Sequence, residues 1–297
     1  MARLVEHHER WSGLETSADN ARVGILGIPF DRAVSWRPGA ALAPERIRSI
    51  TPHLGFYSEE GTKISPCLKD YGDVETDLNW ERYFSSVENR ANEVLSQHPL
   101  ALFLGGDHSV GIPLFSAFAK RYDGPVGYIQ MDSHTDLIDS FEGHRWSHAC
   151  TARRNLEQAN LGYHHLAFIG LRSYLSEEIE LYQEHPEMGW HSARSVYLRG
   201  IDAVVQEVVA QMANCQAVYL SIDIDCLDPA FAPGTGTPEA GGLSTRECLE
   251  ALRTLHKSLP ISAMDIVEVS PPLDHSDITS LAALKIIYET LALRQSP

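Results

Sequence analysis

Short runs of almost uninterrupted apolar residues recur along the chain, and segments of mixed apolar and polar character separate them. Apolar runs of this length are typical of parallel strands that are covered on both faces. We therefore predict strands over six ranges: Val23–Pro29, Leu100–Gly105, Val126–Met131, Leu166–Leu171, Ala217–Ile224 and Ile261–Val269.

The segments between these runs include helix-like stretches at Trp80–Gln97, Ile201–Met212 and Thr245–Lys257. The last follows Ser244 and carries Glu247 three residues later, a capping box in which each side chain satisfies a free N–H of the other residue. Alternating strands and helices predict an α/β fold with a mostly parallel central sheet and helices on both faces. We expect a single domain over residues 1–297.

Composition narrows the class of protein. No run of ~18 apolar residues could span a bilayer, and the first eight residues, MARLVEHH, lack an apolar signal segment. These features predict a cytoplasmic protein without membrane partners. The chain holds 24 Lys and Arg against 40 Asp and Glu, a net charge of -16. Such an acidic chain repels nucleic acid and favours cationic ligands.

The five cysteines are scattered and form no C-x-x-C pair. In a chain of this size and predicted location, they are expected to be reduced and mostly buried thiols. Neither a disulfide framework nor a zinc–thiolate site is predicted.

Polar residues that could bind a ligand or take part in catalysis lie where the predicted strands end. Ligands of open α/β sheets bind beyond the carboxyl ends of the strands, so these residues should meet at one edge of the sheet. Four strands contribute them: Asp107-His108, Asp132-Ser133-His134-Thr135-Asp136, Asp223-Ile224-Asp225, and Asp265 with Glu268.

This set predicts a metal centre. In an extended backbone alternate residues share a face, so Asp132, His134 and Asp136 can point the same way, and Asp223 and Asp225 repeat the pattern. Several carboxylates cannot all ionise at short range unless cations neutralise them. With His108, the ligands suit two divalent ions about 3.5–4 Å apart. Mn²⁺ is our first choice, and Zn²⁺, Co²⁺ and Ni²⁺ also fit these ligand types.

Several stretches of the chain together resemble a known family. They are Gly27–Asp31 with Arg37–Gly39, Gly105–Ser109, Asp132–Asp136, Ser221–Pro238 and Asp265–Val269. These motifs are similar to those of the ureohydrolases, the arginases and agmatinases, and the likeness covers nearly the whole chain. The family usually has alanine where Ser133 stands, and we expect this side chain to point away from the metals.

The resemblance implies a three-layer α/β/α fold, a binuclear manganese centre, and homotrimers or homohexamers that hydrolyse guanidino groups to urea and an amine. It assigns four ligands to each ion, with two of them shared: His108, Asp132, Asp136 and Asp223 to one, and Asp132, His134, Asp223 and Asp225 to the other.

The same resemblance assigns the catalytic roles. Asp136 would hold the nucleophile and then the tetrahedral intermediate, and Glu268 would pair with the guanidinium, with Thr237 beside it. His148 would give the leaving amine its proton. His144, four residues earlier, is the competing candidate.

The far end of the substrate is harder to assign. Arginases recognise the amino acid head with polar residues that Ile138 and Leu175 replace here, so α-amino acid recognition is predicted to be absent. Residues 139–146 should border the pocket. There Glu142 or Asp139 would meet a distal ammonium, Arg145 would instead meet a carboxylate, and Trp146 would pack on the alkyl chain.

We therefore predict a metal-dependent amidinohydrolase that converts agmatine to putrescine, as in polyamine metabolism. A hydrolase of guanidinobutyrate or guanidinopropionate is the alternative. A formimino-group hydrolase and a catalytically silent relative are further readings.

Overall fold

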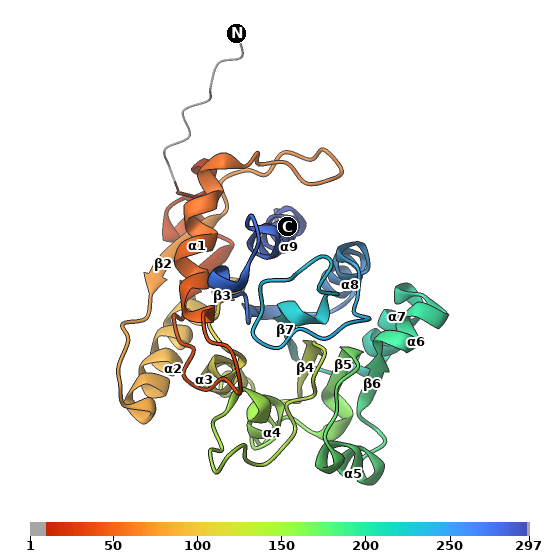
Figure 1. Cartoon of the computed structure of the whole chain (residues 1–297). Helices are drawn as coiled ribbons and strands as arrows, with labels where there is room; N and C mark the ends of the chain where they lie inside the picture. The colour runs from red at the N-terminus through yellow and green to blue at the C-terminus, as the bar shows by residue number, and fades with distance from the viewer. Residues whose placement is uncertain (1–9, 296–297) are drawn as a thin grey trace.

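The computed structural model describes residues 10–295 and is built on one eight-stranded sheet (Figure 1). All neighbouring strands are parallel, in the order β2-β1-β3-β8-β7-β4-β5-β6. The strands are β1 Val23–Gly27, β2 Leu68–Asp73, β3 Leu100–Leu104, β4 Val126–Met131, β5 Leu166–Leu171, β6 Gly189–Ser192, β7 Ala217–Asp223 and β8 Ile261–Val267.

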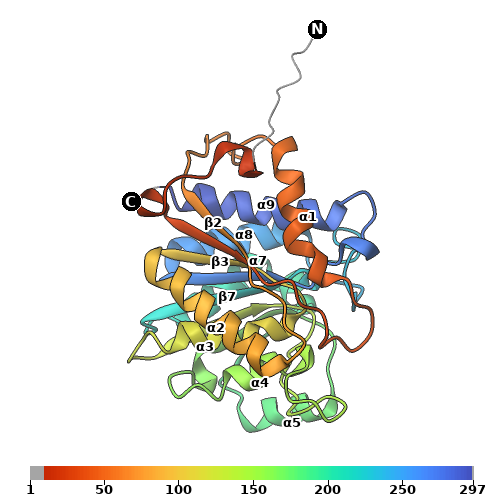
Figure 2. The same ribbon diagram turned by 90° about the vertical axis from the view of Figure 1, so that its left-hand side faces the viewer.

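Helices cover both faces of this sheet, with the sheet between them (Figure 2). One apolar core lies against α1, α6, α7, α8 and α9, and a second lies against α2, α3, α4 and α5. The three-layer α/β/α prediction is confirmed. The helices are α1 Ala43–Ile50, α2 Trp80–Gln97, α3 Gly111–Ala119, α4 Thr151–Asn155, α5 Ser176–Glu184, α6 Ala193–Arg199, α7 Ile201–Gln211, α8 Thr245–Ser258 and α9 Ile278–Leu293. Over residues 10–295, no helix combines the length and apolar character needed to cross a bilayer.

The six predicted strands all form, and each ends within two residues of the predicted boundary. Two strands were not predicted, and both lie at the edges of the sheet. β2 carries charged residues and is largely half-exposed, while β6 has four residues that alternate between buried and half-buried. Edge strands have only one neighbour, and so they need no continuous apolar run.

The predicted capping box forms at the start of α8. The Ser244 side chain accepts a hydrogen bond from the Glu247 N–H at 3.2 Å, and the Ser244 N–H donates to Glu247 Oε2 at 2.7 Å. Two N–H groups that the helix leaves unpaired are thereby satisfied.

We predict that Ser244→Ala lowers the free energy of unfolding by about 1 kcal/mol, because a helix N-cap hydroxyl is lost. Urea denaturation of the variant and the wild type measures the difference. The control is Ser86→Ala at an exposed position inside α2, where alanine favours the helix and stability should not fall. An equal loss in both variants would contradict the capping role.

Candidate metal centre

The candidate ligands, together with Glu268, lie at the carboxyl ends of four strands that are neighbours in the sheet. His108 follows β3, Glu268 follows β8, Asp223 ends β7, and Asp132 follows β4. The order β3-β8-β7-β4 places residues that are distant in the sequence at one edge. The predicted convergence of four strands is therefore present.

The backbone that carries these ligands is not extended, contrary to our prediction, but turns after Asp132 and after Asp223. Asp132 Oδ1 accepts the His134 N–H at 2.7 Å, and Asp223 Oδ1 accepts the Asp225 N–H at 2.9 Å. Such bonds two residues ahead turn the chain, and a 3₁₀ turn begins at Ile224. The expectation of alternate residues on an extended strand was wrong, because each aspartate bends the backbone that follows it.

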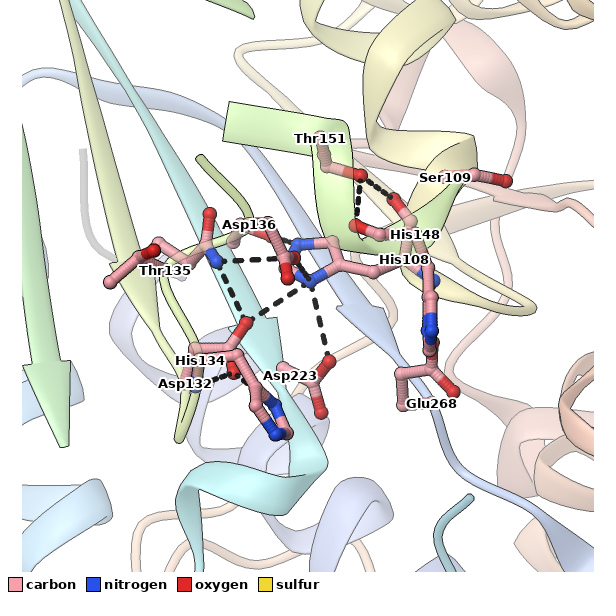
Figure 3. Close-up of polar contacts among 12 residues, drawn as sticks. His108, Ser109, Asp132, His134, Thr135, Asp136, His148, Thr151, Asp223 and Glu268 are labelled. Carbon is pink, nitrogen blue, oxygen red and sulfur yellow. Dashed lines mark hydrogen bonds and ion pairs between the residues drawn. The ribbon is translucent and has the colours of Figure 1, made fainter. Parts of the chain in front are cut away.

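The first cluster consists of His108, Asp132 and Asp136. His108 Nδ1 lies 3.1 Å from Asp132 Oδ2 and 2.9 Å from Asp136 Oδ2. Asp223 Oδ2 is 3.3 Å from the same nitrogen. Figure 3 shows these three carboxylates around the imidazole of His108. All four residues are buried.

The second cluster consists of Asp132, His134 and Asp225. His134 Nδ1 lies 3.5 Å from Asp132 Oδ1 and 3.2 Å from Asp225 Oδ2. Asp132 belongs to both clusters and offers one oxygen to each histidine. A carboxylate that faces two clusters in this way suits a pair of ions bridged by one ligand.

The hydrogen bonds of His108 support metal binding. The Ser221 hydroxyl donates to Asp265 Oδ1 at 2.7 Å, so its oxygen accepts from His108 Nε2 at 2.9 Å. The proton of the neutral ring is then on Nε2, and Nδ1 carries a lone pair that faces three carboxylates. Nδ1 is buried without a hydrogen-bond partner. A cation bound among these atoms would relieve the conflict, and such a partner on the second ring nitrogen is typical of metal-binding histidines.

The pKa values of the carboxylates also reflect the repulsion between buried acidic groups. Burial and the charge of Asp132 raise the pKa of Asp136 to about 6. Burial and the charges of Asp225 and Asp132 raise the pKa of Asp223 well above its usual range. These acids resist ionising together, and divalent cations would remove the penalty. Oxygen and imidazole ligands without a thiolate suit Mn²⁺ and borderline divalent ions.

Ser133 does not lie as expected. Its side chain is fully buried, and its hydroxyl donates to Asp225 Oδ1 at 2.8 Å. The hydroxyl oxygen of Ser133 also lies 3.0 Å from His134 Nδ1. The prediction that this side chain points away from the metals was wrong, because the turn after Asp132 directs it into the second cluster.

A buried pair of titratable groups adjoins the clusters. His148 Nδ1 lies 2.9 Å from Glu268 Oε1, which also accepts the His108 N–H at 2.8 Å. Burial opposes protonation of His148, but the hydrogen bond and charge of Glu268 raise its pKa to about 9. On the other side, Nε2 accepts the Ser35 N–H at 2.9 Å and lies 2.9 Å from the Ser35 hydroxyl. Ser35 thus offers a donor to the neutral ring and an acceptor to the protonated ring.

Two of these acids occupy an unusual backbone conformation. Asp136 has φ 54° and Glu268 has φ 61°, in the left-handed region that residues with a side chain seldom adopt. Neighbouring structure holds both in place, since the Arg153 N–H donates to Asp136 O at 3.0 Å and the Glu268 N–H donates to Gly106 O at 2.8 Å. Strained residues of this kind are often part of functional sites.

A cavity of about 160 Å³ opens above the clusters. The predicted residues that line it are His108, His134, Asp136, His148, Asp223 and Thr237. The remaining wall consists of Ser35, Phe141, Ala149, Ser173, Tyr174, Leu175 and Glu178. Of the described residues that line this cavity, none is a lysine or an arginine. Besides its three histidines, the lining contains three acidic side chains, those of Asp136, Asp223 and Glu178.

Of the loop predicted to border this cavity, residues 139–146, Phe141 lines it, but the residues predicted to contact the substrate do not. Arg145 is exposed and lies 2.7 Å from Glu157. Glu142 and the competing proton donor His144 line a different cavity, and Trp146 packs against Phe84 with ring centroids 5.8 Å apart. None of these residues lines the cavity above His108.

Asp139, in the same loop, pairs with the Arg154 guanidinium at 2.6 Å. It too is absent from the lining of the cavity. The structure therefore does not support the predicted contacts of Asp139, Glu142, Arg145 and Trp146 with a substrate.

Several contributing residues were not singled out in the sequence. Gln130 Nε2 donates to Asp132 Oδ2 at 2.7 Å, and Ser221 supports His108 as described above. Both are polar residues within otherwise apolar strands, a signal that could have identified them. Glu178 and Ser35 gave no such signal, because each reaches the cavity from a loop or helix far away in the sequence.

Comparisons with known proteins show which proteins this chain is similar to. The family model described as "Arginase family" matches residues 21–292. An agmatinase of Bacillus cereus is 36% identical over 279 residues, which cover 93% of this chain and 92% of the relative. The human mitochondrial guanidino acid hydrolase is 34% identical over 94% of this chain and 80% of its own length. The crystal structure of an agmatine ureohydrolase of Thermoplasma volcanium matches with a TM-score of 0.83 at 30% identity, covering 96% of this chain and 94% of that chain.

We predict that Asp132→Asn and Asp225→Asn differ in metal content. Asp132 is shared by both clusters, whereas Asp225 belongs to one, so Asp132→Asn should lose two ions and Asp225→Asn should lose one. Metal analysis after gel filtration of Mn²⁺-loaded protein measures the ratio of ion to chain. Full metal content in both variants would contradict the assignment of these ligands.

We further predict that ion affinity falls as the solution becomes more acidic. Protons compete with cations for these ligands, and the pKa of Asp136 lies at about 6. Below that pH, each displaced proton should weaken the apparent affinity about tenfold per pH unit. Calorimetric Mn²⁺ titrations from pH 8 to pH 5, in buffers of different ionisation enthalpy, measure affinity and proton release. A constant affinity over this range would be inconsistent with the cluster.

Proposed function

This chain belongs to the arginase family, and on that basis we propose that it hydrolyses the guanidino group of agmatine to urea and putrescine. The observation that carries this proposal is the cavity, which both histidine–aspartate clusters border and whose described lining residues include Asp136, Asp223 and Glu178 but no lysine or arginine. A guanidinium is cationic and is attacked poorly by water. Acidic surroundings attract it, and the paired clusters would hold the ions that activate water.

The described residues suit the first stage of this reaction. Two divalent ions, when held by these clusters, would supply a nucleophile by lowering the pKa of bound water towards neutrality. Asp136 lines the cavity and lies at the first cluster, where its carboxylate can accept a hydrogen bond from the attacking oxygen. Glu268 is proposed to hold the guanidinium: it is not itself among the residues that line the cavity, but its Oε1 lies 2.9 Å from Nδ1 of His148, which does line it. Burial would raise its pKa, but the hydrogen bond and charge of His148 keep that pKa below the usual range, so the carboxylate is charged.

His148 is proposed to complete the reaction. Water adds to the guanidino carbon, the bond from that carbon to the alkyl nitrogen breaks, and the alkyl nitrogen leaves with a proton. His148 lines the cavity, and its raised pKa keeps a proton available at neutral pH. The Ser35 hydroxyl and main-chain N–H lie beside Nε2, so the ring has a partner before and after it gives up a proton.

The wall of the cavity favours a cationic or neutral tail over a carboxylate tail. Phe141, Ser173, Tyr174 and Leu175 are uncharged, and the buried carboxylate of Glu178 completes this wall. Glu178 accepts hydrogen bonds from the Thr135 hydroxyl and from main-chain N–H groups of residues 137 and 175. No ion pair with a described cation offsets its charge. An ammonium tail would be attracted here, whereas a carboxylate tail would be repelled by Glu178 and would find no lysine or arginine among the described lining residues.

Three finer features belong to the same proposal. We propose Mn²⁺ as the working ion, because oxygen and imidazole ligands suit it. We propose a homotrimer or homohexamer. Tyr197 and Leu198 on α6 are 84% and 60% exposed, and apolar side chains of this kind are often covered by a second copy. We also propose that the protein acts in the cytoplasm.

Urea release from a substrate panel tests the proposed function. Agmatine, arginine, guanidinobutyrate, guanidinopropionate and guanidine are compared with enzyme loaded with Mn²⁺ or, separately, with Ni²⁺. We predict the highest kcat/KM for agmatine, with arginine and both guanidino acids lower by about tenfold or more. The matched control is Glu268→Gln, which should keep both ions and lose activity.

Each other outcome points to a different function. A preference for guanidinobutyrate would favour the alternative suggested by the human guanidino acid hydrolase. Comparable activity on arginine would contradict the absence of amino acid recognition. A metal-loaded enzyme that releases no urea from any substrate would refute guanidino hydrolysis and leave a formimino-group hydrolase or a silent relative.

A further inference from the structure

Ser133 makes contacts that the roles assigned so far do not use. It is fully buried directly after Asp132, and its hydroxyl oxygen lies 2.8 Å from Asp225 Oδ1 and 3.0 Å from His134 Nδ1. Its main-chain N–H also donates to Asp225 Oδ1, at 3.1 Å. One residue therefore contacts two of the three members of the second cluster and none of its contacts involves His108.

The position of Ser133 is fixed by its neighbours. Its carbonyl accepts the N–H groups of Arg172 and Ser173 at 2.9 and 3.0 Å, at the end of β5. Asp132 Oδ1 accepts the next N–H, that of His134, at 2.7 Å. The main chain is thus held on both sides of the hydroxyl. A buried hydroxyl with a fixed main chain can orient a neighbouring carboxylate at little entropic cost.

The two oxygens of Asp225 consequently have different surroundings. Oδ1 accepts two hydrogen bonds, both from Ser133, whereas Oδ2 lies 3.2 Å from His134 Nδ1 and 3.4 Å from the Thr237 hydroxyl. The hydroxyl of Ser133 thereby holds the carboxylate with Oδ2 toward the second cluster. An alanine here would leave the main-chain N–H as the only one of these two donors.

We propose that Ser133 is a positioning residue for the second metal site, and that its hydroxyl increases the affinity of that site without affecting the first. This inference rests on the proposed metal centre. Groups that orient a ligand in this way commonly change metal affinity by about 10- to 100-fold. The first site has its own positioning hydroxyl, Ser221, which lies 2.9 Å from His108 Nε2. The two serines are therefore a matched pair.

Binding of Mn²⁺ tests this role without reference to activity. Metal-free protein is titrated with Mn²⁺, and electron paramagnetic resonance counts the free ion to give two stepwise constants. Ser133→Ala should weaken one constant about tenfold and leave the other within about twofold of the wild type. Adding Asp225→Asn identifies the affected site, because the double variant should lose the weakened constant and keep the other. Ser221→Ala should weaken the opposite constant.

Ser133→Cys separates the hydroxyl from the volume of the side chain. The thiol fills the same space but is a weak donor, and Mn²⁺ has little preference for sulfur, so this variant should resemble Ser133→Ala. Wild-type constants in Ser133→Cys, or constants that both fall equally in Ser133→Ala, would overturn the proposal.

The two proposals fail in distinguishable ways. A wild-type protein that binds no Mn²⁺ would refute the proposed function together with this inference. A wild type that binds two ions, with unchanged constants in Ser133→Ala, would refute the role of Ser133 alone.

Discussion

The structure of the site depends on one electrostatic constraint, which is the burial of several carboxylates within contact distance of two imidazoles. Asp132, Asp136, Asp223 and Asp225 are all less than a tenth exposed. Such a group of like charges is unfavourable without cations or protons. The surrounding polar groups, from Ser221 behind His108 to the main-chain N–H groups that cap the aspartates, hold these side chains in place despite their mutual repulsion.

The sheet and its turns make this burial achievable. Three strands of the parallel sheet, β3, β7 and β4, supply the candidate ligands, and β8, between β3 and β7, supplies Glu268, so all of these side chains lie at one edge of the sheet. Arg172 supports the turn after β7 by donating to the carbonyls of Asp225, Cys226 and Leu227 at 2.7, 3.3 and 3.2 Å. A single guanidinium with several fixed donors can satisfy several carbonyls at once. The second cluster is therefore held from the main chain as well as from its side chains.

The sequence predicts the fold and the chemistry of the ligands better than it predicts orientation. Buried central strands such as β4 and β7 show as apolar runs, and the acids that follow them are conspicuous. The direction of Ser133 depends on a turn that a local hydrogen bond creates, so an alternation rule misplaces it. The positions of the loop residues were still harder to predict, because Arg145 pairs with Glu157 at the surface and does not line the cavity. Tertiary contacts decide such positions, and the local sequence does not encode them.

The left-handed backbone of Asp136 and Glu268 lowers the stability of the fold at two residues whose side chains are proposed to take part in the reaction. Non-glycine residues there cost on the order of 1–3 kcal/mol each, and glycine would release that cost. Selection for heat resistance alone would thus be drawn to these two positions, where the gain in robustness removes the acids themselves. Directed evolution of this protein would need a screen for turnover at every round, since the most stable variants would include inactive ones.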